Sequence, residues 1–175
     1  MSIVICVVNQ NQKFYLASDL RAIRGGITED NYQKIYEIKE KVYFGMTGIA
    51  EEGHKILANL KANSDKTVSD LIKYTDSIFQ QSENMLTIML SGVDETGKYF
   101  IWQKNHQEKI TNATINDSSI AFSISSNKNV HSFHNYLNSL ISSGINIEQA
   151  IEQTIYFASK MDNTISPTFK LIKHE

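Results

Sequence analysis

We predict an α+β fold for this chain: a four-layer αββα sandwich of two antiparallel sheets, each covered on its outer face by a pair of helices. Two observations lead to this prediction. The expected elements run in the order strands, two helices, strands, two helices and a strand, and many of the strands are joined by short turns. Helix pairs between such runs do not fit βαβ crossovers, whereas two packed sheets with outer helices bury every apolar face.

Strand signals dominate the first fifty residues. Residues 2–8 (Ser-Ile-Val-Ile-Cys-Val-Val) form a continuous apolar run, typical of a strand buried on both faces. A polar turn at 9–12 brings the chain back. The other strands expected here are 13–18, continued by 19–24 as far as Gly25 and Gly26, then 34–38 and 42–46.

The spacing of apolar residues then changes to that of helices. Two amphipathic helices are expected at 49–62 and 67–81. In the second half the same signals predict strands at 85–93, 98–103 and 120–124, helices at 129–142 and 147–161, and a last strand at 168–172. A hairpin turn at 94–97 ends on Gly97, where a positive φ angle is expected.

Composition limits the classes of protein that fit. A chain of 175 residues with 41% hydrophobic residues is long enough for one domain with a real core, and we expect residues 1–175 to form that single domain. A net charge of −2 does not favour nucleic acid or a membrane surface as a partner. The single cysteine excludes an internal disulfide and favours the cytoplasm. No signal peptide, membrane span, phosphate loop or dinucleotide fingerprint is apparent, so no cofactor is expected.

Ser2 is the first candidate for chemistry. If Met1 is the only residue to be removed, Ser2 carries both a hydroxyl nucleophile and a free α-amine. A hydroxyl needs a neighbouring base, and an α-amine with a reference pKa of about 7.7–8.0 is partly neutral near pH 7. Many ordinary proteins also begin with Met-Ser, so the dipeptide alone is weak evidence.

Asp19 and Lys34 strengthen this candidate. Pairing of the first two strands across their turn, with residue numbers that sum to about 21, would place Asp19 opposite Ser2. Lys34 opens an apolar strand, and its positive charge near Asp19 would favour the neutral amine and a developing oxyanion. The alternatives are a surface ion pair between Asp19 and Arg21 and a solvated strand end at Lys34.

A glycine-containing strand end at 44–48 (Phe-Gly-Met-Thr-Gly) precedes the first helix. A glycine there allows a backbone N–H to approach a substrate closely, although Gly45 and Gly48 also fit turn and packing roles. Cys6 is read as a core residue, because it lies inside the first apolar strand. His131 and His134 share a helix face but have no further ligands at a telling spacing, so no metal site is expected.

The first fifty residues resemble the β-type subunits of proteasomes, within the N-terminal-nucleophile hydrolases. The resemblance is carried by Ser2-Ile-Val-Ile, Leu16-Ala-Ser-Asp-Leu-Arg21, Gln33-Lys-Ile-Tyr-Glu-Ile38 and Val42-Tyr-Phe-Gly-Met-Thr-Gly48. It implies an αββα sandwich with Ser2 in place of the family's threonine nucleophile. It also implies that Asp19 and Lys34 tune the amine and that the Gly45 N–H forms the oxyanion hole.

The resemblance extends to a substrate pocket and to the C-terminal half. It points to Tyr43 and Thr47 as pocket residues, and we place Arg21 with them. The family's Gly-Ser-Gly turn is replaced by 122–126 (Phe-Ser-Ile-Ser-Ser), where Ser125 fits the family's serine after a one-residue shift; a helix-capping role fits these serines equally well. Asp162 matches an aspartate that follows the fourth helix of the family, and Ser166 matches the family's next serine after a similar shift.

The expected function is hydrolysis of amide bonds, with peptides or proteins as substrates, through an acyl-enzyme on Ser2. The alternative is a non-catalytic proteasome-like assembly subunit, which the serine nucleophile and the missing Gly-Ser-Gly favour. The resemblance also implies a homo-oligomer, a ring or stacked rings, with an ATPase as a further partner.

Overall fold

The structure is a computed structural model that describes residues 2–9, 13–79, 85–106, 110–114, 121–126 and 129–174. The expected turn at 10–12, the helix end at 80–81, the strand start at 120 and Met1 lie outside these residues. The elements in chain order are β1 (Ile3–Val8), β2 (Phe14–Asp19), β3 (Ala22–Arg24), β4 (Ile27–Glu29), β5 (Ile35–Lys39), β6 (Val42–Gly48), α1 (Ala50–Ala62), α2 (Val68–Phe79), β7 (Leu86–Val93), β8 (Tyr99–Asn105), β9 (Ile110–Thr114), β10 (Ala121–Ser126), α3 (Val130–Ser142), α4 (Ile147–Met161) and β11 (Phe169–His174).

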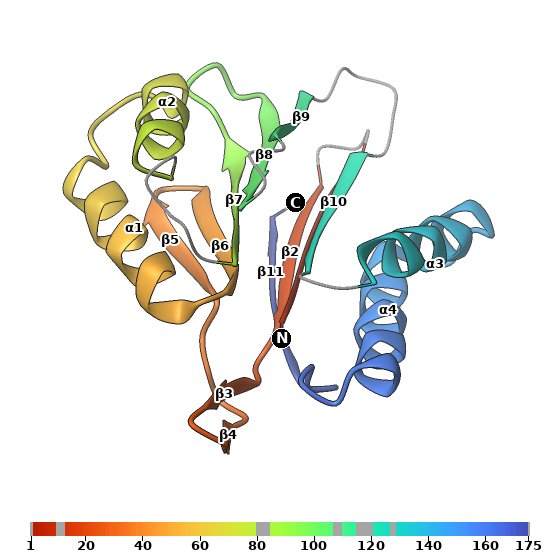
Figure 1. The fold of residues 1–175 in the computed structure, drawn as a ribbon. Coiled ribbons are helices and arrows are strands. Elements are labelled where there is room, and N and C mark those ends of the chain that lie inside the picture. The colour runs from red at the N-terminus through yellow and green to blue at the C-terminus, as the bar shows by residue number, and fades with distance from the viewer. Residues whose placement is uncertain are drawn as a thin grey trace.

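Two antiparallel sheets form the middle of the molecule. One has the strand order β10-β1-β2-β11 and the other β5-β6-β7-β8-β9. Helices α1 and α2 cover the outer face of the second sheet, and α3 and α4 cover the outer face of the first (Figure 1). The predicted four-layer αββα sandwich is therefore confirmed. None of the helices in the described part of the chain is long and apolar enough to cross a membrane.

The apolar run of β1 is buried on both faces, as its composition predicts. Ile3, Ile5 and Val7 pack in the core formed with α3 and α4. The alternate residues of β1, such as Val4, pack in the core between the two sheets. A third core lies between the five-stranded sheet and α1 and α2. Burying one such aliphatic side chain stabilises the fold by about 1.5–3 kcal/mol, so β1 anchors two of the three cores.

The register of β1 and β2 differs by one residue from the expected one. Val4 lies opposite Ser18, so paired residue numbers sum to 22 and Asp19 is level with Ile3, not with Ser2. The Asn9 N–H donates to the Lys13 carbonyl at 3.1 Å, so the strand pairing extends to Asn9, which was expected to lie in the turn.

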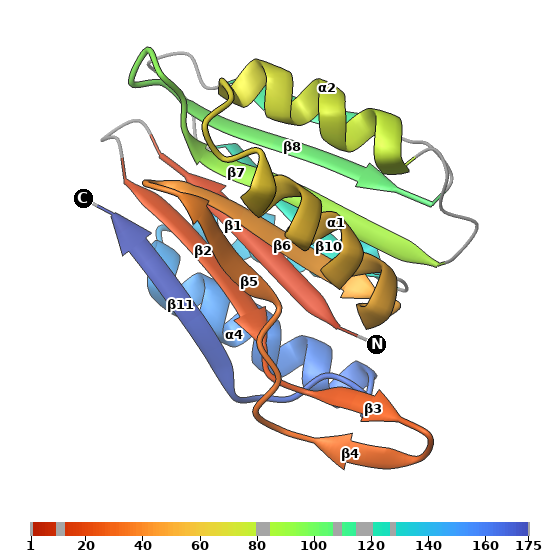
Figure 2. The same cartoon turned by 90° about the vertical axis from the view of Figure 1, so that its left-hand side faces the viewer.

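The expected continuation of the second strand through residue 24 is wrong. β2 ends at Asp19, and β3 pairs with β4 in a separate two-stranded sheet that projects from the sandwich (Figure 2). Arg24 lies opposite Ile27, and the two glycines between them have φ angles of 54° and 82°, as a two-residue hairpin turn requires. Just past the end of β2, the Arg21 N–H donates to the Asp19 carboxylate at 3.0 Å.

Strand β9 has no counterpart in the prediction. It pairs only with β8 at the edge of the five-stranded sheet, and its sequence (Ile-Thr-Asn-Ala-Thr) carries little apolar signal. An edge strand needs few buried side chains, so periodicity alone does not reveal it.

Candidate functional site

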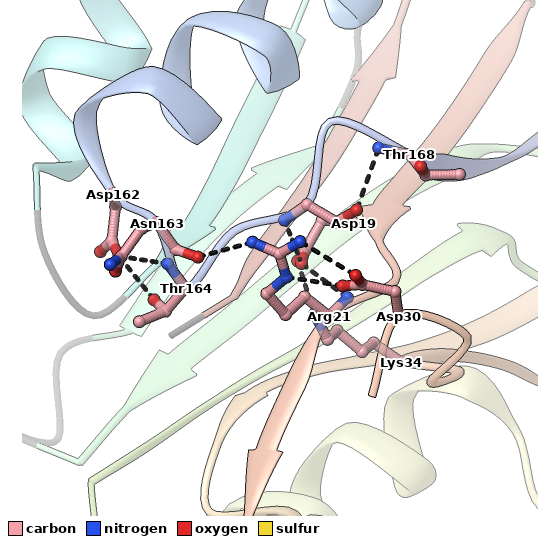
Figure 3. A network of polar contacts seen from close by, with 9 residues as sticks. Asp19, Arg21, Asp30, Lys34, Asp162, Asn163, Thr164 and Thr168 are labelled. Atoms are coloured by element: carbon pink, nitrogen blue, oxygen red, sulfur yellow. Dashed lines mark hydrogen bonds and ion pairs between the residues drawn. The ribbon is translucent and has the colours of Figure 1, made fainter. Parts of the chain in front are cut away.

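Asp19 is the centre of a buried polar network at one end of the sandwich. The residue is 0% exposed. Its Oδ1 accepts hydrogen bonds from the Ile3 N–H at 2.9 Å and from Lys34 Nζ at 2.6 Å. Its Oδ2 accepts from the Arg21 N–H at 3.0 Å and from the Ser166 N–H at 3.2 Å (Figure 3). Four donors on one carboxylate compensate for its burial, so the aspartate is held in one orientation.

Lys34 is buried beside this carboxylate. Only 2% of the residue is exposed, and its carbonyl accepts from the Met46 N–H at 3.1 Å, just before β5 begins. Burial lowers the pKa of Lys34, and the nearby charge of Asp19 only partly opposes that shift. The ammonium therefore gives up its proton more readily than a surface lysine does.

Ser2 lies immediately before β1 at the edge of a cavity of about 880 Å³. It is 8% exposed, and Lys34, Thr47 and Gly48 line the same cavity. The N–H of Ile3, the residue after Ser2, donates to the same Asp19 oxygen that accepts from Lys34. A single carboxylate oxygen thus ties the start of β1 to the lysine.

The two glycines of β6 lie in different surroundings. Gly45 sits mid-strand opposite Met89, where a Cβ would lie 3.0 Å from Val4 Cγ1, and it does not line the cavity. Gly48 lines the cavity and has a φ angle of 107°; a Cβ there would lie 2.1 Å from the Met85 carbonyl oxygen. Gly45 therefore lets the two sheets approach closely, and Gly48 is the glycine at the strand end.

The Gly48 N–H is available at the cavity. Ile49 N–H donates to the Met85 carbonyl on the β7 side, and Met46 N–H donates to the Lys34 carbonyl on the β5 side. Successive N–H groups along a strand point alternately to its two neighbours, so the Gly48 N–H points to the same side as that of Met46, toward β5. At this level β5 has not yet begun, because its first residue is Ile35. Helix α1 begins next to it with no side-chain cap at Ile49, which adds an electropositive helix start to this wall.

Thr47 and Ser125 form a hydroxyl pair between the two sheets. Their Oγ1 and Oγ atoms are 2.9 Å apart, and both residues are buried. Ser125 lies in β10 opposite Val4 and is not among the residues that line the cavity. The hydroxyl of Ser125 therefore supports the strand that carries Gly48. The side chain of Ser123 lies outside the described residues.

Arg21 and Tyr43 do not line the cavity. The Arg21 guanidinium donates from Nε and Nη2 to both oxygens of Asp30 at 2.5 and 3.0 Å, and from Nη1 to the Asn163 carbonyl at 2.7 Å (Figure 3). The Tyr43 hydroxyl lies 2.6 Å from Nε2 of His174, in β11. Arg21 thus joins the start of the β3–β4 hairpin to the turn after α4, and Tyr43 belongs to the core between the sheets.

The Asp162 side chain accepts hydrogen bonds within the turn that precedes Ser166. Its Oδ1 accepts from the Thr164 N–H at 2.9 Å and from the Thr164 hydroxyl at 2.6 Å (Figure 3). The Ser166 Oγ accepts from the Thr168 N–H at 3.1 Å, while its N–H reaches Asp19. Asp162 therefore forms no hydrogen bond or ion pair with Asp19 or Lys34 within the described part of the chain, and its carboxylate stabilises the turn that leads to Ser166.

Several cavity residues were absent from the predicted site. Among them are Arg24 from β3, Tyr32, and His54 from α1, which line the same cavity as Ser2 and Lys34. The Tyr32 hydroxyl lies 2.6 Å from Nε2 of His54, and burial, followed by the charge of Arg24, lowers the pKa of His54. A signal existed in α1, because Ala50, His54 and Ala58 repeat every fourth residue and form one row along the helix.

Two further groups have ordinary surroundings. Burial raises the pKa of the Cys6 thiol to about 12, which suits a core residue. The ring of His134 packs against Phe122 with centroids 4.5 Å apart. Within the described ranges, no group of three or more His, Cys, Asp or Glu residues is placed to hold a metal ion.

Comparison with known proteins gives a match in structure but not in sequence. No family model matches the chain, and no curated protein matches it. The structure is similar to the crystal structure of eukaryotic HslV from Trypanosoma brucei, with a TM-score of 0.73 and 11% sequence identity, over 98% of each chain. HslV is a proteasome-type N-terminal-nucleophile hydrolase. The chain therefore has the αββα sandwich fold of the proteasome-type N-terminal-nucleophile hydrolases.

Proposed function

We propose that this protein is a peptidase of the proteasome type in which Ser2, freed by removal of Met1, is the nucleophile. The observation that carries the proposal is the shared Asp19 oxygen, which accepts from both the Ile3 N–H and Lys34 Nζ beside a cavity lined by Ser2. A buried, paired lysine with a lowered pKa next to a hydroxyl at a cavity is an arrangement that suits covalent catalysis.

In the proposed reaction the Ser2 Oγ attacks the carbonyl carbon of an amide bond, and the α-amine of Ser2 accepts the hydroxyl proton. The positive charge of Lys34 favours the neutral amine before the attack. The tetrahedral oxyanion receives a hydrogen bond from the Gly48 N–H, which we propose in place of Gly45 because only Gly48 lines the cavity.

The intermediate then expels the amine product. The Ser2 α-ammonium returns its proton to the leaving nitrogen, and an ester between Ser2 and the acyl part of the substrate remains. Water attacks this ester, the α-amine accepts the water proton, and the Ser2 oxygen is protonated as the acid product leaves. Asp19 holds Lys34 in place throughout.

Labelling of Ser2 tests this proposal. The intact mass of the protein from its native cell reports whether Met1 is removed. A β-lactone probe should then acylate Ser2, and Ser2→Ala should abolish that label, while the matched variant Ser139→Ala, on the exposed side of α3, should keep it. Retained Met1, or labelling that survives Ser2→Ala, would contradict the proposal and favour the non-catalytic assembly subunit.

We further propose that the protein acts as a homo-oligomer, built as a ring or stacked rings, on peptide or protein substrates, with an ATPase as a partner. The fold likeness to HslV supports this part of the proposal. A cytoplasmic location, suggested by the single cysteine, belongs to the same proposal. Light scattering coupled to size exclusion measures the assembly, and a monomer at micromolar concentration would contradict it.

A further inference from the structure

The cavity beside Ser2 carries one positive charge that no carboxylate balances. Lys34 in its wall is balanced by Asp19. Lys55 forms an ion pair with Glu51 at 3.2 Å. Glu51 is the only residue with a carboxylate among the described residues that line the cavity. The remaining cation is Arg24, and no described residue forms an ion pair with it.

Arg24 is held in place although it has no ionic partner. Its guanidinium carbon lies 5.0 Å from the centre of the Tyr32 ring, a cation–π contact on the wall of the cavity. Tyr32 is itself fixed by its hydroxyl contact with His54 and by its N–H, which donates to the Leu20 carbonyl at 2.8 Å. The positive charge of Arg24 also contributes, after burial, to the lowered pKa of His54, another residue that lines the cavity.

The two arginines of the chain make the contrast clear. The Arg21 guanidinium donates hydrogen bonds to the Asp30 carboxylate and to the Asn163 carbonyl. Arg24, three residues later, has one face on Tyr32, and none of its N–H groups donates a hydrogen bond to a described residue. A guanidinium whose face is stacked keeps the planar fork that matches a carboxylate.

We infer that the cavity binds a carboxylate of the substrate through Arg24, so that peptides with an aspartate or glutamate next to the cleaved bond are the preferred substrates. This inference rests on the proposed function for the position of the cleaved bond, because it places the peptide by its attack on Ser2. The apolar part of the same wall, Met46 and Ile49, packs against the methylene groups of such a side chain. A terminal carboxylate of the peptide offers the same chemistry and is separated from a side-chain carboxylate by the test below.

Binding to the full-length Ser2→Ala protein tests the inference without turnover. The probes are two blocked peptides that differ only by glutamate or glutamine at the residue before the cleaved bond, and a third with glutamine there and a free terminal carboxylate. Calorimetry should give about a five- to tenfold tighter dissociation constant for the glutamate peptide than for the glutamine peptide. The preference should shrink at ~1 M NaCl, because salt screens a partly exposed pair. A preference for the third peptide instead would assign Arg24 to the terminal carboxylate and overturn the side-chain assignment.

Two substitutions in the Ser2→Ala background link the preference to Arg24. Arg24→Gln should abolish the discrimination between glutamate and glutamine. Lys160→Gln is the matched control, because Lys160 lies 4.9 Å from the ring centre of Tyr156 on α4 and also loses one charge and one cation–π contact. Equal affinity of the two peptides, no binding of either at millimolar concentration, or a preference that survives Arg24→Gln would each overturn the inference.

The outcome is independent of the test of Ser2. If Ser2 is labelled but glutamate and glutamine peptides bind equally, the proposed function stands and the carboxylate inference fails. If Ser2 is never labelled but the glutamate preference depends on Arg24, the cavity is a carboxylate-binding site and the proposed catalysis fails. Circular dichroism of Arg24→Gln shows whether the β3–β4 hairpin substitution leaves the fold intact, and Arg24→Lys, which keeps the charge but loses the fork, should keep part of the preference.

Discussion

Lys34 and Lys104 are each 2% exposed, and each contacts an aspartate, but of the two only Lys34 lines the cavity beside Ser2. Lys34 reaches Asp19 at 2.6 Å, and Lys104, in β8, reaches Asp76 of α2 at 2.5 Å. The aspartates differ: the Asp19 side chain is 0% exposed, whereas that of Asp76 is 31% exposed. Lys104 also lies 5.5 Å from the ring centre of Phe79. A buried ion pair alone therefore does not distinguish the two lysines; the surroundings of the carboxylate and the cavity beside Ser2 do, and they are why we propose the catalytic site at Lys34.

Asp19→Asn should give the largest effect on stability. One amide nitrogen would face two of the four donors that now bind the carboxylate, and the residue is 0% exposed. We expect the free energy of unfolding to fall by about 3–5 kcal/mol. Urea denaturation followed by circular dichroism measures this loss.

The matched variant is Asp76→Asn. Its side chain is partly exposed, so water can compensate, and the loss should be about 1 kcal/mol. Similar losses for the two variants would show that the two ion pairs are equivalent and would remove the structural distinction between them.

Lys34→Met should reduce the rate at which a β-lactone acylates Ser2 by about 100-fold, because the positive charge near the α-amine and the oxyanion is lost. Lys104→Met removes an equally buried ammonium that does not line the cavity, and it should label at close to the wild-type rate. Mass spectrometry of the labelled protein against time gives both rates. A comparable slowing in the two variants would mean that Lys34 supports the fold and not the chemistry.

The difference between the two lysines was only partly visible in the sequence. The αββα fold could be predicted, because it follows from the order of strand and helix patterns along the sequence and needs no knowledge of tertiary contacts. Asp19 and Lys34 could be proposed because each stands at the end of an apolar strand. Lys104 was not proposed, since it follows the expected strand 98–103, and a lysine at a strand end is ordinarily solvated.

The remaining site residues depend on geometry that sequence patterns do not contain. Whether Gly45 or Gly48 meets the cavity depends on which N–H groups of β6 are already used by β5 and β7. Arg21 and Arg24 look alike in the sequence, but β2 ends at Asp19 and only Arg24, in β3, lines the cavity. Tyr43 and Thr47 lie four residues apart on β6. Only Thr47 lines the cavity, because only the end of β6 reaches it.

Thr47→Val should have a smaller effect at the Lys34 end of the sheet. It removes the 2.9 Å contact between Thr47 and Ser125 and leaves one buried hydroxyl without its partner. We expect a loss of about 1 kcal/mol in the free energy of unfolding, and about the same for Ser125→Ala. The double variant should lose less than the sum, since both changes break one contact. Additive losses in urea denaturation would show that the two hydroxyls act independently.

The smallest expected effect is a change with pH in the contribution of Lys34 to the free energy of unfolding. Because burial lowers the pKa of Lys34 below 10.5, the unfolded chain binds more protons at this site than the folded chain between the two pKa values. The contribution of Lys34 to the free energy of unfolding should therefore rise as the pH increases through that window. Cys6 and Tyr36, whose pKa values are raised from 9.0 and 10.0 to about 12, act in the opposite sense between those values, because they lose their protons first in the unfolded chain. The prediction thus concerns the difference between wild-type and Lys34→Met, which should change in favour of the wild-type protein as the pH rises. A constant difference would mean that Lys34 titrates as a solvated lysine does, and that its contact with Asp19 fully offsets its burial.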